Sequence, residues 1–235
     1  EDKFYDKAES FNLYPTVDDK YFTYEELEKK IKKLQTDKDG NLIILYAQNK
    51  DEQHTYIESA KEKGYEVLLL DSPIIPHLMQ KLESKKEKIK FSRVDSDTLE
   101  NLIKKDEEVI SKLTDEEKEK LKPMIETAVE NEKYTVQLEA LDSNSMPFML
   151  AQPEFMRRMK EMQQTGGGAM GNLPDMYSLI VNTNHELVGK ILNTRTEKKR
   201  NSLIKQSIDL AKLSQNNLTG KDLTEFINRS IDLIK

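Results

Sequence analysis

The sequence predicts a helix-rich α+β fold with a small α/β/α unit followed by an α+β domain ending in a helical bundle. Three observations predict it. Strand and helix patterns alternate between residues 41 and 71, strand patterns return at 134–140 and 176–182, and two long amphipathic helices close the chain. A chain of 235 residues is long enough for two modest domains, each with its own core.

The first unit contains a strand–helix–strand pattern. The turn residues 37–40 lead into a β-rich run at 41–47, and 51–63 has the pattern of a helix that ends at Gly64. A second strand follows at 65–71. This spacing predicts a βαβ crossover with parallel strands.

Shorter signals flank this crossover. Thr23 and Glu26 have the spacing of a capping box, which predicts a helix that begins there and runs through Leu34. Pro73 and Pro76 interrupt the chain after the second strand, and the helical pattern resumes at 78–82.

A stretch dense in both signs of charge, 83–122, separates the two units. We expect a solvated helical surface there, with a second capping box at Thr114 and Glu117. We place the domain boundary at Val94, which gives domains of 1–94 and 95–235.

The second unit returns to strand at 134–140 and again at 176–182. His185 follows the later strand, where we expect it to hydrogen-bond locally in a turn before a helix at 187–192.

An amphipathic helix lies between these strands. Pro153 suits its first turn, and apolar residues recur at steps of three and four, which places them on one face: Phe155, Met156, Met159 and Met162. A glycine-rich run at 165–171 follows, and we interpret it as a hinge. Methionine is frequent on surfaces that accept many partners, so the stripe suggests a binding surface, although such a stripe more often belongs to a core.

The last two helices carry wide apolar stripes on a short connection. These residues are Leu203, Ile204, Ile208 and Ala211 on the first helix, and Leu223, Phe226, Ile227, Ile231 and Ile234 on the second. Two helices cannot bury both stripes on each other alone, so either the preceding sheet or a second copy of the chain covers them. We favour the second copy, which makes this a dimerisation bundle with two-fold symmetry.

Composition and motifs exclude several kinds of chemistry. The net charge of −6 disfavours sequence-independent binding to nucleic acid, and the lack of cysteine excludes disulfides and thiolate catalysis. We find no phosphate loop, no nucleophile elbow and no metal-ligand spacing among His54, His77 and His185. No run is long enough for a membrane span, and Glu1-Asp2-Lys3-Phe4 has neither the charge pattern nor the apolar segment of a signal peptide. The sequence begins with Glu1 rather than methionine, so we expect a fragment of a longer protein.

Two ordered sets of residues resemble a known family. The first set resembles the end of the middle domain of heat-shock protein 90 chaperones, and it is most similar to the bacterial form, high-temperature protein G. It comprises Tyr65-Glu66-Val67-Leu68-Leu69-Leu70 before Pro73-Ile74. The second set resembles the C-terminal domain of that family. It comprises Asp142-Ser143-Asn144-Ser145-Met146-Pro147, the amphipathic helix with Phe155 and the methionines, and Leu179-Ile180-Val181-Asn182-Thr183-Asn184-His185-Glu186-Leu187.

The resemblance implies a non-catalytic part of an ATP-dependent, cytoplasmic chaperone. The family's ATPase site, with its ATP and magnesium, belongs to another domain, so no cofactor is expected here. The family's C-terminal domain forms homodimers, and its amphipathic helix contacts unfolded or partly folded client proteins, which matches Phe155, Met156, Met159 and Met162. His77 stands where bacterial relatives can carry an exposed tryptophan that extends the client surface.

Two alternatives remain from the residues alone. One is an RNA-associated or signal-sequence-binding Met-rich module, with Arg157 and Arg158 on phosphates. The other is a small α/β enzyme with a ligand at the carboxyl ends of the first strands, near Asn49, Lys50 and the Asp71-Ser72 pair.

Overall fold

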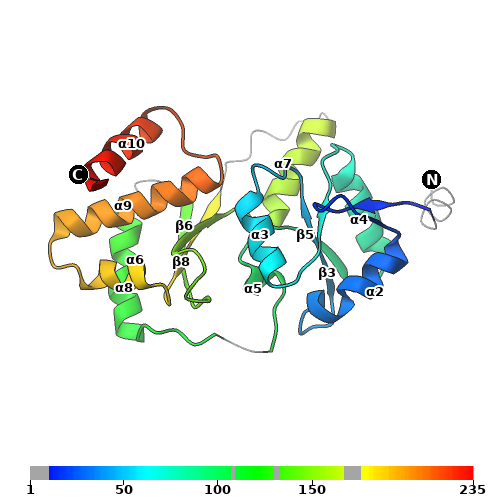
Figure 1. Ribbon diagram of the computed structural model, residues 1–235, viewed down its shortest axis with the longest axis horizontal. Coiled ribbons are helices and arrows are strands. Elements are labelled where there is room, and N and C mark those ends of the chain that lie inside the picture. The colour runs from blue at the N-terminus through cyan, green and yellow to red at the C-terminus, as the bar shows by residue number, and fades with distance from the viewer. Residues whose placement is uncertain (1–10, 107–108, 130–132, 167–175, 235) are drawn as a thin grey trace. The chain divides into compact units, whose positions relative to one another are not determined.

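The structure is a computed structural model that describes residues 11–106, 109–129, 133–166 and 176–234, with the backbone alone for 162–166 and 233. It confirms the helix-rich α+β fold (Figure 1). The chain divides into two compact units. The first comprises the described residues up to 106 together with helix α7 (Glu154–Gly166), and the second comprises the other described residues from 109 onward.

The first unit is built on a parallel sheet with the strand order β4-β3-β5. The central strand β3 (Leu42–Ala47) pairs with β4 (Val67–Leu69) and with β5 (Ile89–Arg93). Every residue of β3 is buried, as expected for a strand covered on both faces. The predicted βαβ crossover is therefore confirmed.

Helices surround this sheet in Figure 1. Besides α7, they are α2 (Tyr24–Gln35), α3 (His54–Glu62), α4 (Ile75–Lys85) and the short α5 (Leu99–Leu102). The strands β1 (Tyr14–Pro15) and β2 (Tyr21–Phe22) form a small antiparallel pair of their own. The predicted capping box of α2 is present, and Gly64 has a φ of +75° after α3, a conformation that glycine adopts without strain.

Three features of this unit differ from the prediction. The edge strand β5 lies in the stretch that we expected to be a solvated helical surface. Its two buried residues, Ile89 and Phe91, are separated by the exposed Lys90. Helix α4 begins at Ile75 and accommodates Pro76 in its first turn. The unit continues to residue 106 rather than ending at 94, since Asp95 and Ser96 are buried within it.

The second unit has a mixed sheet with the strand order β6-β8-β7. Strand β6 (Tyr134–Glu139) runs parallel to β8 (Tyr177–Asn182), and β7 (Phe148–Ala151) runs antiparallel to it. Strands β6 and β8 confirm the prediction, whereas the short β7 was not predicted.

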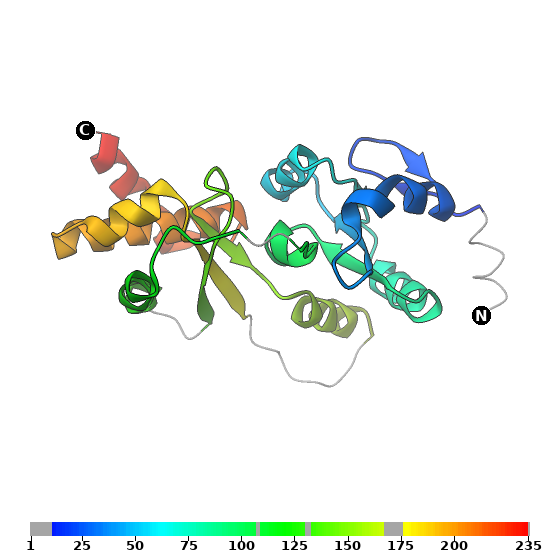
Figure 2. The ribbon, with the colours of Figure 1, turned by 90° about the horizontal axis from the view of Figure 1, so that it is seen from below.

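Helices cover one face of this sheet and form the core of the unit with it. Helices α6 (Asp115–Val129) and α9 (Glu197–Ser214) pack on the strands and on each other (Figure 2). The remaining two helices are α8 (Glu186–Asn193) and α10 (Gly220–Ile234). Thr114 and Glu117 form the predicted capping box of α6.

Candidate functional site

Helix α7 belongs to the first unit, where its charged face is turned inward. Glu154, Arg157, Arg158 and Glu161 lie one or two turns apart on one side of the helix, and all four bond to residues of that unit or to one another. Phe155 is 71% exposed. Amphipathic helices of globular proteins usually bury the apolar face, so this orientation is inverted.

Arg157 occupies the centre of the buried side. Its guanidinium is almost fully buried and donates hydrogen bonds to the hydroxyl of Tyr46, to Glu154 and to Glu161. Tyr46 is completely buried in β3, and its hydroxyl donates to Glu154 Oε1 at 2.8 Å. A planar guanidinium suits such a site because its fixed fork can satisfy several acceptors at once.

Arg158 connects the helix to the edge strand β5. It donates to Glu83 of α4 at 2.8 Å and to the carbonyl oxygen of Phe91 at 2.6 Å. The backbone N–H of Phe91 donates to Glu83, and that of Arg93 donates to Glu154. Side chains of α4 and α7 therefore satisfy backbone groups that an edge strand otherwise leaves open to another chain.

The charges of this cluster determine its protonation. Burial alone would raise the pKa of Glu154, but the neighbouring charges of Arg157 and Arg158 outweigh it and lower the pKa. Burial, reinforced by the charge of Glu154, raises the pKa of the Tyr46 hydroxyl, which is protonated at neutral pH and serves as a donor. The cluster is an ionised, hydrogen-bonded structural network.

The apolar face of α7 carries the residues predicted to bind clients. Phe155 is exposed, whereas Met156 and Met159 are half-buried. The side chain of Met162 and the glycine run from 167 lie outside the described residues.

The buried arginines also bear on the two alternatives. Arg157 and Arg158 form ion pairs with carboxylates. Neither is therefore free to contact phosphates, as the hypothesis of an RNA-associated module requires. Ligands of α/β sheets bind at the carboxyl ends of the strands, and here α7 occupies that edge beside Gln48 and Arg93.

Two of the four residues suspected of binding a ligand at this edge make structural contacts. Asn49 Oδ1 accepts hydrogen bonds from the backbone N–H groups of Asp51 and Glu52, and Lys50 pairs with Asp19 at 2.6 Å. Asp71 and Ser72 are exposed in the turn before α4.

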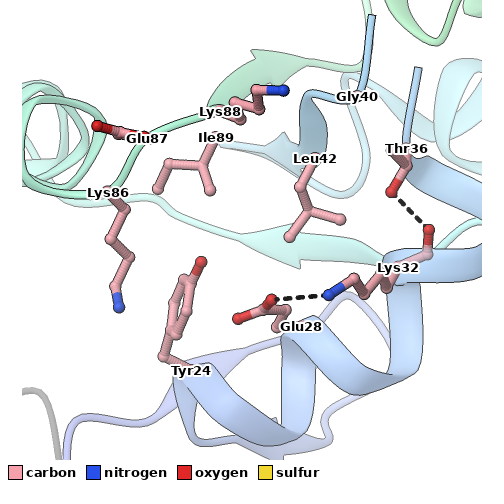
Figure 3. Close-up of a pocket in the computed structure, with 10 residues that line it drawn as sticks. All are labelled: Tyr24, Glu28, Lys32, Thr36, Gly40, Leu42, Lys86, Glu87, Lys88 and Ile89. Atoms are coloured by element: carbon pink, nitrogen blue, oxygen red, sulfur yellow. Dashed lines mark hydrogen bonds and ion pairs between the residues drawn. The ribbon is translucent and has the colours of Figure 1, made fainter. Parts of the chain in front are cut away.

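A pocket of about 400 Å³ lies near the opposite, amino ends of β3 and β5 (Figure 3). Two of its three lysines already have partners, because Lys32 pairs with Glu28 and the ammonium of Lys86 lies 4.0 Å from the centre of the Tyr24 ring. The pocket also contains Glu87, which reduces its attraction for anions. We assign no cofactor to it.

The predicted dimerisation residues fall into two groups. Ile204, Ile208 and Ala211 are buried in the core of the second unit, against its sheet and α6. For these three the expectation of a second copy is corrected, because the preceding sheet covers them.

The other members remain accessible to different degrees. Ile227, Ile231 and Ile234 are exposed, with Ile234 at 85%. Leu203, Leu223 and Phe226 are half-buried.

Polar contacts join α10 to α9. Arg229 pairs with the buried Asp209, Gln206 donates to Ser230 at 2.9 Å, and Lys205 lies 3.3 Å from Glu225. These contacts use one side of α10, and the isoleucines at 227, 231 and 234 lie on another side. An apolar surface is consequently left uncovered on α10.

The segment Asn182-Thr183-Asn184-His185 forms hydrogen bonds to neighbouring loops of the second unit. Asn184 is buried and bonds to the backbone of Ile110, Lys112 and Leu141. The Nδ1 atom of His185 accepts a hydrogen bond from Leu187 N at 3.0 Å, which confirms its predicted local role at the start of α8. These residues support the fold rather than a reaction.

No metal or membrane site emerges from the described residues. Among them, no three histidine or carboxylate side chains are grouped to hold a metal ion. His54 and His77 are both exposed, on α3 and in the first turn of α4. Of the helices described, none has the length and apolar character needed to cross a membrane.

Comparison with known proteins finds relatives that are chaperone proteins. The chain is 36% identical to the chaperone protein HtpG of Bacteroides thetaiotaomicron, over all of its own length and 44% of that protein. It is 38% identical to chaperone protein HtpG of Porphyromonas gingivalis, over 91% of its length and 32% of that protein. No family model matches the sequence.

The whole chain is therefore related to the HtpG chaperones, the bacterial heat-shock protein 90 family. It matches the C-terminal part of these relatives and spans less than half of their length. The resemblance seen in the sequence is confirmed.

Proposed function

We propose that this chain is a non-catalytic, cytoplasmic part of an ATP-dependent chaperone that binds unfolded or partly folded proteins and forms homodimers. The first unit would be the end of the middle domain, and the second unit the C-terminal dimerisation domain. ATP and magnesium would act on another part of the protein, and neither nucleic acid nor membrane would be a partner. Relatedness to the HtpG chaperones supports the chaperone class.

The observation that carries client binding is the outward apolar face of α7. Phe155 is 71% exposed beside the half-buried Met156 and Met159. Burying one large apolar side chain contributes about 1.5–3 kcal/mol, so a few of them give useful but reversible affinity. Methionine adapts to differently shaped partners, which suits a surface that must accept many sequences.

A binding titration tests this part of the proposal. The probe is reduced, carboxymethylated α-lactalbumin, a permanently unfolded protein, labelled for fluorescence anisotropy. We expect Phe155→Glu combined with Met159→Glu to abolish binding while the mass of the chain in solution stays unchanged. Tyr21→Glu is the matched control, since Tyr21 is 63% exposed on β2, away from α7. Equal binding by the double variant and the control would contradict the proposal.

The observation that supports dimerisation is the exposed isoleucine side of α10. A two-fold pairing would cover this surface with the same surface of a second copy. Light scattering over a dilution series tests it with a chain ending at Thr219, which lacks α10 but keeps the core residues of α9. We expect the intact chain to remain dimeric and the shortened chain to be monomeric. A monomeric intact chain at every concentration would contradict the proposal.

A further inference from the structure

The orientation of α7 needs a physical cause. The hydrophobic effect alone would turn Phe155 and the methionines inward and leave the charged residues in water. The observed arrangement instead exposes Phe155, leaves Met156 and Met159 half-buried and buries Arg157, so specific polar contacts must hold the helix. Glu154, Arg157, Arg158 and Glu161 supply those contacts.

Arg157 is the member with the least access to water. Its side chain is 4% exposed, compared with 17% for Arg158 and 21% for Glu154. The Arg157 guanidinium also lies 5.6 Å from the centre of the Tyr46 ring, in cation–π range, in addition to its hydrogen bond with the Tyr46 hydroxyl. A buried charge is tolerated only where such partners are present, so this contact permits few other orientations of the helix.

We infer that Arg157 is a positioning residue for the client-binding face, because its contact with Tyr46 fixes α7 on the sheet with Phe155 turned outward. The inference rests on the proposed function. Arg157 touches no client itself, since it is buried on the opposite side of the helix. Its role is to remove alternative orientations before a client arrives, which reduces the ordering cost of binding.

Arg157→Met tests the inference because methionine keeps much of the volume but removes the charge and the hydrogen bonds. Arg195→Met is the matched control, the same substitution at an exposed arginine outside α7. Amide hydrogen exchange of residues 154–161 reports how firmly α7 is held, and exchange of β3 reports whether the unit remains folded. If Arg157→Met unfolds the unit, Tyr46→Phe is the milder variant, since it removes only the hydroxyl that meets Arg157.

We expect residues 154–161 to exchange about tenfold faster, with β3 still protected as in a folded unit. Correspondingly, the apparent Kd for carboxymethylated α-lactalbumin should rise about tenfold if one helix in ten keeps the competent orientation. Arg195→Met should change neither quantity. Unchanged exchange at 154–161 in both Arg157→Met and Tyr46→Phe would overturn the inference.

A second result would also overturn it, namely faster exchange with an unchanged Kd, because the helix would then not need fixing for binding. Failure of the proposed function has a different signature. In that case the unsubstituted chain would not bind the probe, while the exchange of α7 would still respond to Arg157→Met.

Discussion

The hydroxyl of Tyr46 accepts a hydrogen bond from the guanidinium of Arg157, although 111 residues separate them in the sequence. Tyr46 lies on the central strand of the first unit, and Arg157 lies on a helix inserted between strands of the second unit in sequence order. This contact places a helix from the later part of the chain on the earlier unit. The apolar side of the helix is thereby left for other partners.

Removing the Tyr46 hydroxyl should destabilise the first unit. Tyr46→Phe keeps the ring but leaves Arg157 and Glu154 each without one partner. Because hydrogen bonds to charged groups contribute about 1.5–3 kcal/mol, we expect the free energy of unfolding in urea to fall by that amount. Tyr21→Phe, at an exposed position, should change it by less than about 0.5 kcal/mol. A loss of similar size in both variants would refute this role.

The ion network should make stability depend on pH. Glu154 has a folded pKa below its ordinary value of 4.5, so its charge stabilises the fold above pH 4.5, and the stabilisation is lost as pH falls through the lower folded pKa. We expect Glu154→Gln to be less stable than the unsubstituted chain at pH 7. The difference should shrink as the pH is lowered below 4.5. Urea unfolding of both chains across this range checks the sign, and a constant difference would argue against an ionised Glu154.

The two groups of isoleucines in the last helices should respond differently to substitution. Ile208→Ala should lower the free energy of unfolding by about 2–5 kcal/mol, because it leaves a cavity in the core of the second unit. Ile227→Glu combined with Ile231→Glu should instead halve the mass measured by light scattering, since both side chains are exposed on α10. A dimer that survives the double substitution would exclude this surface as the interface.

The buried asparagine at 184 should be essential to the second unit. Asn184→Ala would leave the backbone groups of Ile110, Lys112 and Leu141 without their partner. We expect a loss of at least about 2 kcal/mol in the free energy of unfolding, because each unsatisfied buried group costs about 1–3 kcal/mol. Asn193→Ala is the control, since that side chain is exposed and bonds only within its own helix. Equal thermal stability of the two variants would contradict the assignment.

Local patterns predicted most of the secondary structure. The capping boxes at Thr23 and Thr114 and the glycine at 64 are short-range signals, so the residues themselves determine them. The strands β5 and β7 were missed because each is short, and the charged residues around Ile89 and Phe91 resemble those of a surface helix.

The orientation of α7 could not be predicted from periodicity. The spacing of Phe155 and Met159 defines an apolar face but does not say whether that face is buried. Which face is buried depends on Tyr46 and Glu83, which lie far away in the sequence. Likewise, the stripe of α9 could be assigned to its sheet only once the strands facing Ile204 and Ile208 were known.

Mapping the bound client on the chain shows whether α7 carries the client-binding face. Amide hydrogen exchange is measured with and without saturating carboxymethylated α-lactalbumin. We expect slower exchange at residues 154–161 on α7, with no change in α2, which lies in the same unit. Protection confined to other segments, with α7 unaffected, would contradict it.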